Sequence, residues 1–445
     1  MCAIVGVVNS QDAASIAYYA LFAMQHRGQE ASGISTSDGK LCTIKGNGLV
    51  TEVFNTESFK KLKGDMAVGH NRYATAGSAS AGDAQPVAIS YALGELSIVH
   101  NGNLVNKDEV RERLVQNGAI FSSNMDTENI AHLIARSTKA TLKERIKEAL
   151  GQIIGAYCLL ILEGDAMYVV RDRWGVRPLS IGRLKDGGLI VASETCAFDL
   201  VGAKFIRDVR PGEMLSIKRG QSEFASEQLY ESEPRICAFE YIYFARPDSV
   251  IEGKSVYAAR KLMGAALARA GVPEGADMVV AVPDSGVAAA LGYAKEAGLA
   301  YEAAIVRNHY VGRTFIEPTQ ELRNLKVKLK LNPMSSELAG KSVVVVDDSI
   351  VRGTTSKKIV ELLRTAGAKQ VHFRVAAPEL RYPERYGIDT PTSEELISYR
   401  LNCDEVCEYI GADSLEFLGL EALVEALGDE RKYSLVSFDG DYFIR

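Results

Sequence analysis

The sequence predicts two domains of different fold class, an α+β domain in the first half and an α/β domain with a parallel sheet in the second. At 445 residues, the chain is too long for one ordinary hydrophobic core. The first half has short apolar runs separated by turns. After about residue 236, strand-like and helix-like runs alternate, as they do in a parallel sheet covered by helices.

Short apolar runs define the expected strands of the first half. Ala3 to Val8 is the first run, and similar runs follow at 66–70 and 96–100. Two longer runs flank the turn sequence Glu163-Gly164-Asp165 and predict a β-hairpin over residues 156–172.

Two helices are expected between these strands. Asn106 and Glu109 have the spacing of a capping box, which marks a helix start, and Gly118 is a natural stop for that helix. A second helix is expected over residues 127–136.

Residues 219–236 are polar, contain Pro234 and lack a clear period, so we expect the boundary between the domains here. The predicted domains are 2–230 and 231–445, the second ending in a helical extension. Four consecutive valines at 343–346 are too β-branched for a comfortable helix and predict a buried strand. The other elements expected in this half are strands at 278–282 and 371–376 and helices at 285–297 and 355–365.

Composition narrows the class of protein. The formal net charge of −6 argues against nucleic-acid binding. Seven cysteines with no disulfide-like spacing are typical of a reducing compartment. We find neither a signal peptide nor an apolar stretch long enough to span a bilayer. We therefore expect a soluble cytoplasmic protein that binds neither nucleic acid nor membranes.

Cys2 is a candidate nucleophile because it follows the initiator methionine directly. Removal of Met1 would leave a thiol and a free α-amino group on the same residue. The reference pKa of such an amine is about 7.7–8.0, so it can act as a general base near neutral pH. A thiolate is a strong nucleophile toward a carboxamide. The alternative is that Cys2 is a small buried residue at the start of a strand.

Three further segments contain groups that an acyl-transfer site for a free amino acid needs. Asn101-Gly102 can supply donors for a developing oxyanion and a close backbone approach. Arg72 is a suitable cation for a substrate carboxylate, and Asp126 is a suitable anion for its ammonium group. Each also has a structural explanation, since Asn-Gly often forms a hairpin turn and Asp126 can cap the following helix.

Five segments, in order over the first half, together resemble the glutamine-hydrolysing domain of N-terminal-nucleophile amidotransferases. They are MCAIVGVV (1–8), QHRGQEASGI (25–34), GHNRYAT (69–75), VHNGNL (99–104) and SNMDTE (123–128).

This resemblance implies an αββα glutaminase domain with Cys2 as nucleophile and its own α-amino group as base. It further implies that Asn101 and the Gly102 N–H form the oxyanion hole, while Arg72 and Asp126 hold the α-carboxylate and α-ammonium of glutamine. For the histidines of these segments we expect structural hydrogen bonding rather than catalysis; they are His26, His70 and His100.

The most informative stretch of the second half is 343–356, where a strand ends in two acids before a loop rich in glycine and hydroxyl groups. Ligands of open α/β sheets bind at the carboxyl ends of strands. Backbone N–H groups of residues 349–355 can hold a phosphate at the helix start. Asp347 and Asp348 can bind ribose hydroxyls or help place Mg²⁺. The structural alternative is a polar turn in which Asp and Thr only cap the helix.

This stretch resembles the phosphoribosyl-diphosphate signature of type I phosphoribosyltransferases. Residues 279–286 (VVAVPDSG) resemble the other phosphate-contacting loop of that fold, and 307–315 (RNHYVGRTF) resemble its mobile flap, although a surface loop with two solvated arginines would look similar. The resemblance implies Mg²⁺ near Ser285, Asp347 and Asp348. The implied ligands of phosphoribosyl diphosphate are Asp284, Ser285, Arg307, Arg313, Asp347, Asp348, Ser349, Arg352, Gly353, Thr354 and Thr355.

Both halves in this order, with FEYIYFARPDS (239–249) between them, resemble the glutamine phosphoribosylpyrophosphate amidotransferases, which commit phosphoribosyl diphosphate to purine synthesis. The resemblance implies internal passage of ammonia, feedback inhibition by purine nucleotides and a homo-oligomer. Some members bind a 4Fe–4S cluster through four cysteines. Here only Cys237 stands at a ligand position, and 382–386 and 434–438 contain no cysteine, so no cluster is expected.

Two other functions stay open at this point. The N-terminal motifs alone would also suit an amidotransferase that delivers ammonia to a sugar phosphate. The pair Asp347-Asp348 before a phosphate loop argues against it, because sugar isomerase domains lack that pair. A non-catalytic protein that senses phosphoribosyl diphosphate is the other alternative, and Cys2 together with the acidic composition argues against it.

Overall fold

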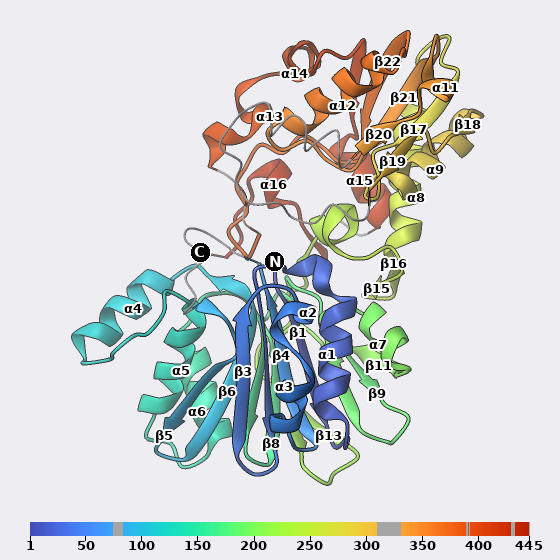
Figure 1. Ribbon diagram of the computed structural model, residues 1–445. Coiled ribbons are helices and arrows are strands. Elements are labelled where there is room, and N and C mark those ends of the chain that lie inside the picture. Colours follow the sequence, from blue (N-terminus) through green and yellow to red (C-terminus); the bar gives the residue numbers. More distant parts are fainter. Residues whose placement is uncertain (74–82, 309–330, 389, 391, 429–431, 445) are drawn as a thin grey trace.

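Two stacked antiparallel sheets form the centre of the first domain (Figure 1). The computed structural model describes residues 1–73, 83–308, 331–388, 390, 392–428 and 432–444. One sheet has the strand order β11 (Lys204–Asp208), β9 (Ser180–Arg183), β10 (Leu189–Ala192), β1 (Ala3–Val8), β4 (Met66–Arg72), β2 (Ala31–Ser37) and β3 (Leu41–Asn47). The other has the order β13 (Phe224–Gln228), β12 (Glu213–Lys218), β8 (Ala166–Arg171), β7 (Gly155–Glu163), β6 (Gly94–Leu104) and β5 (Val87–Tyr91).

Helices cover the outer face of each sheet. Alternation along β1 explains the layers, since Ile4 and Val8 pack between the sheets while Val5 and Val7 pack toward the helices. The helices beside the first sheet are α1 (Ala13–Ala23), α2 (Val50–Val53), α3 (Thr56–Lys61) and α7 (Cys196–Val201). Beside the second sheet lie α4 (Lys107–Gln116), α5 (Asp126–Arg136) and α6 (Leu142–Leu150). These layers confirm the predicted αββα fold.

A parallel sheet forms the centre of the second domain, as predicted. Its strand order is β18 (Ala300–Tyr301), β17 (Met278–Ala281), β21 (Ser342–Asp347), β22 (Gln370–Val375) and β23 (Ser414–Phe417), and every neighbouring pair is parallel. The longer helices are α8 (Val256–Ala270), α9 (Val287–Ala297), α12 (Thr354–Thr365), α14 (Cys403–Ile410) and α15 (Leu420–Leu427). The short elements are β19 (Ile305–Arg307), β20 (Leu331–Pro333), α11 (Ser335–Leu338), α13 (Ile397–Arg400) and α16 (Val436–Asp439). None of the helices in the described ranges is both long and apolar enough to cross a bilayer.

Two local predictions were wrong in detail, and the predicted boundary stretch contains a strand that was not expected. β6 continues through Asn101-Gly102 to Leu104, because β7 pairs with it along its whole length, so these residues do not form a turn. Asn106 stands at the N-cap of α4, as predicted, but its side chain makes no capping hydrogen bond, because its Oδ1 accepts the Ile154 N–H at 2.9 Å. The polar stretch 219–236 contains a strand, β13, which pairs with β12 at the sheet edge.

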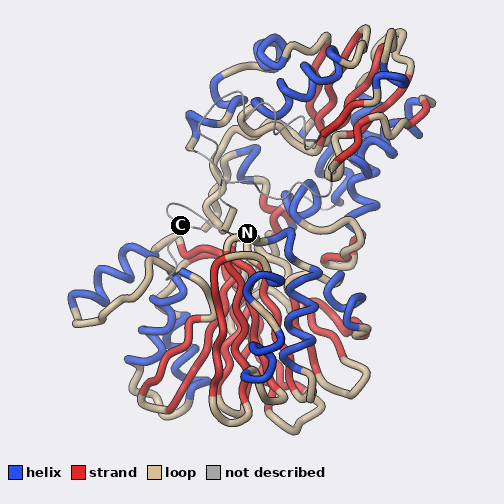
Figure 2. Tube along the Cα trace, viewed as in Figure 1, coloured by secondary structure: helices blue, strands red, loops and turns tan. Residues whose placement is uncertain are grey.

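At the border between the domains, ion pairs join arginines of the first domain to glutamates of the second, and two of the three pairs are fully buried. Loops and short elements predominate there (Figure 2). They include β14 (Ile236–Cys237), which pairs with β24 (Tyr433–Ser434), the helical turn η3 (Glu240–Phe244), and the hairpin β15 (Val250–Ile251) and β16 (Lys254–Ser255). Arginines on the first-domain side meet glutamates on the second-domain side. The pairs are Arg27–Glu240 at 2.9 Å, Arg171–Glu252 at 2.6 Å and Arg177–Glu384 at 2.7 Å.

Candidate active sites

Cys2 directly precedes β1 and lies beside the C-terminal part of β6. Its backbone N–H donates to Asn101 Oδ1 at 3.2 Å. This bond fixes the orientation of the amide and leaves Asn101 Nδ2 buried, with no hydrogen-bond partner among the described residues. Burial raises the pKa of the Cys2 thiol, which contacts the carbonyl oxygen of Tyr73 at 3.8 Å. An unused amide donor therefore lies next to the predicted nucleophile.

Gly102 is held closely by the strand beside it. A Cβ at this position would lie 2.0 Å from the carbonyl oxygen of Ala156 and 2.9 Å from His100 Nε2. No other residue type fits there without moving β7. His100 Nδ1 lies 3.3 Å from Asp126 Oδ1, and its Nε2 has no partner among the described residues. His100 therefore makes a polar contact with Asp126, the residue predicted to bind the ammonium group of the substrate.

Arg72 and Asp126 both act on the Cys2 thiol electrostatically, Arg72 lowering and Asp126 raising the pKa of the thiol. Asp126 Oδ2 accepts the Leu104 N–H at 2.9 Å. Burial would raise the pKa of Asp126, but His100 and the Leu104 N–H outweigh it and lower this pKa, so the carboxylate is an anion. Arg72 Nη2 pairs with Asp83 at 3.2 Å.

Met1 is buried, with 1% of the residue exposed. Its sulfur lies 2.6 Å from Arg177 Nη1 and 3.9 Å from Arg27 Nη2. Burial lowers the pKa of the Met1 amino group to about 5. While Met1 is present, the Cys2 nitrogen is an amide and has no lone pair available for base catalysis.

Arg27 is a site residue that the sequence reasoning missed. Its Nε donates to the carbonyl oxygen of Cys2 at 3.0 Å, and its two other nitrogens pair with the buried carboxylates of Glu194 and Glu240. The residue stands inside the QHRG segment, which was the available signal. Burial of a charge depends on partners far away in the chain, so that segment alone could not indicate it.

The two acids of the second domain lie at the end of β21, buried and in contact with each other. The Asp348 N–H donates to Asp347 Oδ1 at 2.9 Å, and Ser349 Oγ donates to Asp348 Oδ1 at 2.5 Å. Burial raises the pKa of both carboxyls, and the charge of Asp348 raises that of Asp347 further. Ser285, from the loop after β17, hydrogen-bonds to Asp348. The two predicted loops are therefore brought together.

After the acids, the loop opens into α12. Gly353 has a φ of 75°, which favours glycine, and a Cβ there would lie 2.5 Å from Ile397 Cδ1, so another residue would also have to displace that side chain. Arg352, Thr354 and Thr355 are exposed at this helix start, and Arg352 pairs with Glu395 at 3.0 Å.

Of the predicted flap, Arg307 is described and pairs with Asp284 of the loop after β17. Arg313 lies outside the described residues.

The segments compared with iron–sulfur ligand positions lie together at the domain border. Cys237 pairs with Ser434 between β14 and β24, and the Tyr382 N–H donates to the Ser437 carbonyl at 3.2 Å. Cys237 is buried, which raises the pKa of its thiol to about 12. Within the described ranges, no group of three or more His, Cys, Asp or Glu side chains is arranged to hold a metal ion.

Each half of the chain matches a family model. The model described as a glutamine amidotransferase domain matches residues 70–199, and the one described as a phosphoribosyl transferase domain matches residues 253–398. The chain is 48% identical over 447 residues to amidophosphoribosyltransferase 2, chloroplastic, of Arabidopsis thaliana, covering 100% of this chain and 79% of that protein. It is also 48% identical over 452 residues to the amidophosphoribosyltransferase of Bacillus subtilis, covering 99% and 94%.

Two solved structures agree with the whole fold. One is the glutamine phosphoribosylpyrophosphate amidotransferase from B. subtilis complexed with ADP and GMP, with a TM-score of 0.94 at 46% identity, covering 100% of this chain and 98% of that one. The other, described as the allosteric regulatory enzyme of purine biosynthesis, has a TM-score of 0.95 at 46% identity, covering 100% and 96%.

These matches confirm the two-domain fold class and the enzyme activity expected from the motifs. Neither the sugar-phosphate alternative nor the non-catalytic sensor is favoured by them. The chain belongs to the amidophosphoribosyltransferase family, the glutamine-dependent pentosyltransferases that catalyse the first step of purine biosynthesis.

Proposed function

We propose that Cys2 takes ammonia from glutamine and that the second domain joins it to phosphoribosyl diphosphate. Cys2 Sγ attacks the carboxamide carbon, ammonia leaves, and water hydrolyses the thioester to glutamate. Ammonia then attacks C1 of the ribose and diphosphate leaves, giving 5-phosphoribosylamine. The observation that carries the first half is the orientation of Asn101, whose Oδ1 faces the Cys2 nitrogen while Nδ2 is buried and unused.

The α-amino group of Cys2 serves as the base once Met1 is removed. It accepts the thiol proton and returns a proton to the departing ammonia. Asn101 Nδ2 and the Gly102 N–H hold the oxyanion. The hydrogen bond from the Cys2 nitrogen to Asn101 Oδ1 supports this role, because a free amine can make the same bond.

Arg72 and Asp126 hold the α-carboxylate and α-ammonium of glutamine. The lowered pKa of Asp126 supports the assignment, since the group must be an anion to bind ammonium. Arg72 already pairs with Asp83, so the substrate carboxylate either displaces Asp83 from Arg72 or binds Arg72 beside it.

For phosphoribosyl diphosphate, the proposed ligands are those of the two loops and the flap. Backbone N–H groups and hydroxyls at the start of α12 bind phosphate, and Asp347 and Asp348 bind the ribose hydroxyls. Two buried acids in contact, each with a raised pKa, also fit a divalent cation, so we assign Mg²⁺ to Ser285, Asp347 and Asp348. When bound there with the substrate, Mg²⁺ neutralises charge on the leaving diphosphate.

Several wider properties are proposed with this function. Purine nucleotides are the expected inhibitors, supported by the ADP and GMP in the B. subtilis structure. A homo-oligomer is supported by the exposed aromatic side chains of Tyr19 and Phe22 on α1. The cysteines form no disulfides, which supports a reducing, cytoplasmic location. Residues 382–386 and 434–438 contain no cysteine, which supports the proposal that the chain binds no iron–sulfur cluster. β13 pairs with β12 of the first domain, whereas β14 pairs with β24 of the second, which supports a domain boundary near residue 230.

The test is diphosphate release from phosphoribosyl diphosphate and Mg²⁺ with glutamine, with ammonium chloride, or with no nitrogen donor. Intact mass first establishes that the chain starts at Cys2. Release that depends on glutamine, with equal glutamate, supports both half-reactions. Glutamate formation without diphosphate release from such a chain would contradict the proposed second half.

A further inference from the structure

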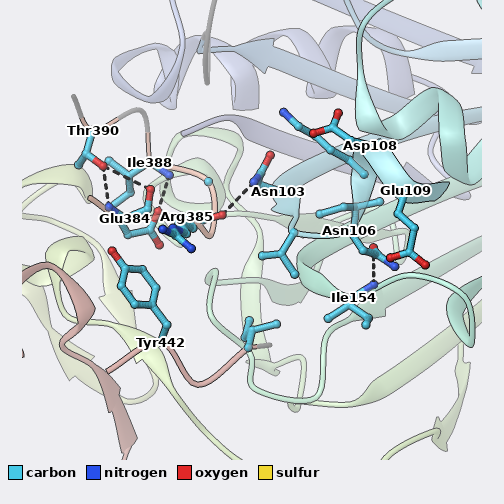
Figure 3. Close-up of a pocket in the computed structure, with 15 residues that line it drawn as sticks. Asn103, Asn106, Asp108, Glu109, Ile154, Glu384, Arg385, Ile388, Thr390 and Tyr442 are labelled. Carbon is cyan, nitrogen blue, oxygen red and sulfur yellow. Dashed lines mark hydrogen bonds between the residues drawn. The ribbon is translucent and has the colours of Figure 1, made fainter. Parts of the chain in front are cut away.

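A turn of the second domain, residues 384–388, lies directly against the oxyanion strand of the first (Figure 3). Asn103 Nδ2 donates to the carbonyl oxygen of Arg385 at 2.8 Å. A Cβ on Gly387 would lie 3.0 Å from the carbonyl carbon of Gly102 and 3.1 Å from its Cα. A cavity of about 590 Å³ opens beside this contact, between the start of α4 and the turn. The backbones of the two domains therefore touch at the proposed oxyanion glycine.

The carboxylate of Glu384 holds the shape and the place of this turn. Its Oε2 accepts the N–H groups of Tyr386 at 2.9 Å and Ile388 at 2.8 Å. Its Oε1 accepts from Arg177 Nη2 at 2.7 Å, and Arg177 Nε donates to the Tyr386 carbonyl at 3.0 Å. The side chains of Glu384 and Arg177 are both fully buried. The turn is thus fixed internally and fastened to the first domain.

Gly387 has a φ of 118°, a conformation that side chains disfavour. On one side, Gly102 is closed in by β7, where Ala156 leaves no space for a Cβ. On the other side it is closed in by Gly387. The Gly102 peptide is consequently held between two backbones that belong to different domains.

We propose that Gly387, held in place by Glu384, is a positioning residue for glutamine hydrolysis. Its contact fixes the backbone at Gly102 so that the Gly102 N–H points toward the oxyanion. This inference rests on the oxyanion role proposed for Gly102. An oxyanion donor acts only at its correct distance and direction, so a small displacement there slows the chemical step more than it weakens substrate binding.

The first experiment compares Gly387→Ala with Gly411→Ala in the full chain. Gly411 is a matched control, because it also has a positive φ, 77°, and a Cβ there would contact nothing within 4 Å. For Gly387→Ala we expect kcat for glutamine hydrolysis to fall about 10- to 100-fold, with little change in KM. Ammonia-dependent diphosphate release should be retained. The control should lose some thermal stability and keep kcat.

Two further variants keep the inference testable if Gly387→Ala does not fold. Asn103→Ala removes only the bond to Arg385 and should lower kcat for glutamine hydrolysis a few-fold. Glu384→Gln keeps one oxygen for the two N–H groups of the turn but places an amide NH₂ against Arg177. It should lower kcat more than Asn103→Ala does and less than Glu384→Ala.

The inference would be overturned if Gly387→Ala raised KM for glutamine and left kcat unchanged, or if it lost ammonia-dependent activity to the same extent as glutamine hydrolysis. Equal kcat values for Gly387→Ala and Gly411→Ala would also overturn it. Asn101→Ala separates this failure from failure of the proposed function. If Asn101→Ala hydrolyses glutamine normally, the oxyanion assignment itself is wrong. If Asn101→Ala is slow while Gly387→Ala is not, only the positioning role is wrong.

Discussion

The two proposed sites differ in how the chain assembles them. The proposed glutamine site around Cys2, here called the amide site, draws its groups from the start of β1 and from β4, β6 and α5, which are far apart in sequence and meet only when the sandwich is complete. The phosphoribosyl site takes most of its groups from one continuous stretch, Asp347 to Thr355, with Asp284 and Ser285 beside it. Phosphate recognition can be encoded locally because backbone N–H groups at one helix start suffice. Acyl transfer needs nucleophile, base, donors and substrate clamps converging on one atom.

The sites also differ in how their polar groups are satisfied. Around Cys2 most of the described polar groups are buried and bonded to each other, with Asn101 Nδ2 and His100 Nε2 as buried exceptions. At the start of α12 the hydroxyl groups of Thr354 and Thr355 are exposed, and so is the guanidinium of Arg352, which pairs with the exposed carboxylate of Glu395. Perturbation of the first site should therefore affect stability and catalysis together, whereas perturbation at the exposed rim of the second should affect catalysis.

Cys2→Ala tests whether the sites are separable and has the largest expected effect. Glutamine-dependent diphosphate release should fall at least about 10⁴-fold, because no other group can form the thioester. Release with ammonium chloride should persist, because the second domain keeps its own groups. Steady-state diphosphate assays with each nitrogen donor measure both. Loss of both activities would mean that the sites are not independent.

Asp347→Asn tests the opposite case, a change that should lower turnover with both nitrogen donors. Turnover with glutamine and with ammonium chloride should fall in parallel, by about 10²- to 10³-fold, because both routes need phosphoribosyl diphosphate and its metal. Glutamate formation without phosphoribosyl diphosphate should be unaffected. A selective loss with glutamine alone would contradict the assignment of Asp347 to the second site.

His70→Gln tests how burial of a titratable side chain at the first site affects the pH dependence of stability. Burial lowers the pKa of His70 from 6.5 to about 3, so the folded ring stays neutral while the unfolded ring takes a proton below pH 6.5. Stability from this group is therefore lost as the pH falls from 6.5 toward 3, by up to about 1.4 kcal/mol per pH unit. The free energy of unfolding between pH 6.5 and 5 should fall less steeply in His70→Gln. Equal slopes in parent and variant would show that another group is responsible.

The smallest expected effect is a gain of stability at the second site. The pKa of Asp347 is raised above its usual 3.8, so the folded state disfavours the charged form and the cost is present at neutral pH. Without ligands, Asp347→Asn should raise Tm at pH 7.5 by roughly 2–4 °C, about 1 kcal/mol. Calorimetry should show this gain shrinking as the pH approaches 4. A lower Tm for the variant at pH 7.5 would mean that the carboxylate stabilises the fold.

Where local signals dominate, the sequence predicted the fold closely. The four valines lie within β21, and the turn at Glu163-Gly164-Asp165 joins β7 and β8. The predictions failed where a distant partner decides the outcome. The Asn106 side chain bonds to Ile154 instead of to an N–H group of α4, and pairing with β7 extends β6 through Asn101-Gly102.

The candidate sites follow the same rule. The contiguous loop at Asp347 could be identified from spacing, and the amide-site residues were identified through a set of motifs taken together. Arg27 and Gly387 could not be identified from the sequence, because the role of each depends on a contact with a segment far along the chain. Their neighbours give no periodicity or spacing that reveals such a contact.

The polarity of the domain border bears on attempts to study the domains separately. Arg27, Arg171 and Arg177 on one side find carboxylates on the other, in Glu240, Glu252 and Glu384. A fragment limited to the first domain would expose these arginines as a cationic face, and a fragment limited to the second domain would expose the glutamates as an anionic face. The first fragment would then adhere to polyanions such as nucleic acid during purification, although the intact chain carries a net charge of −6. Two co-expressed fragments, by contrast, would attract each other with a defined orientation.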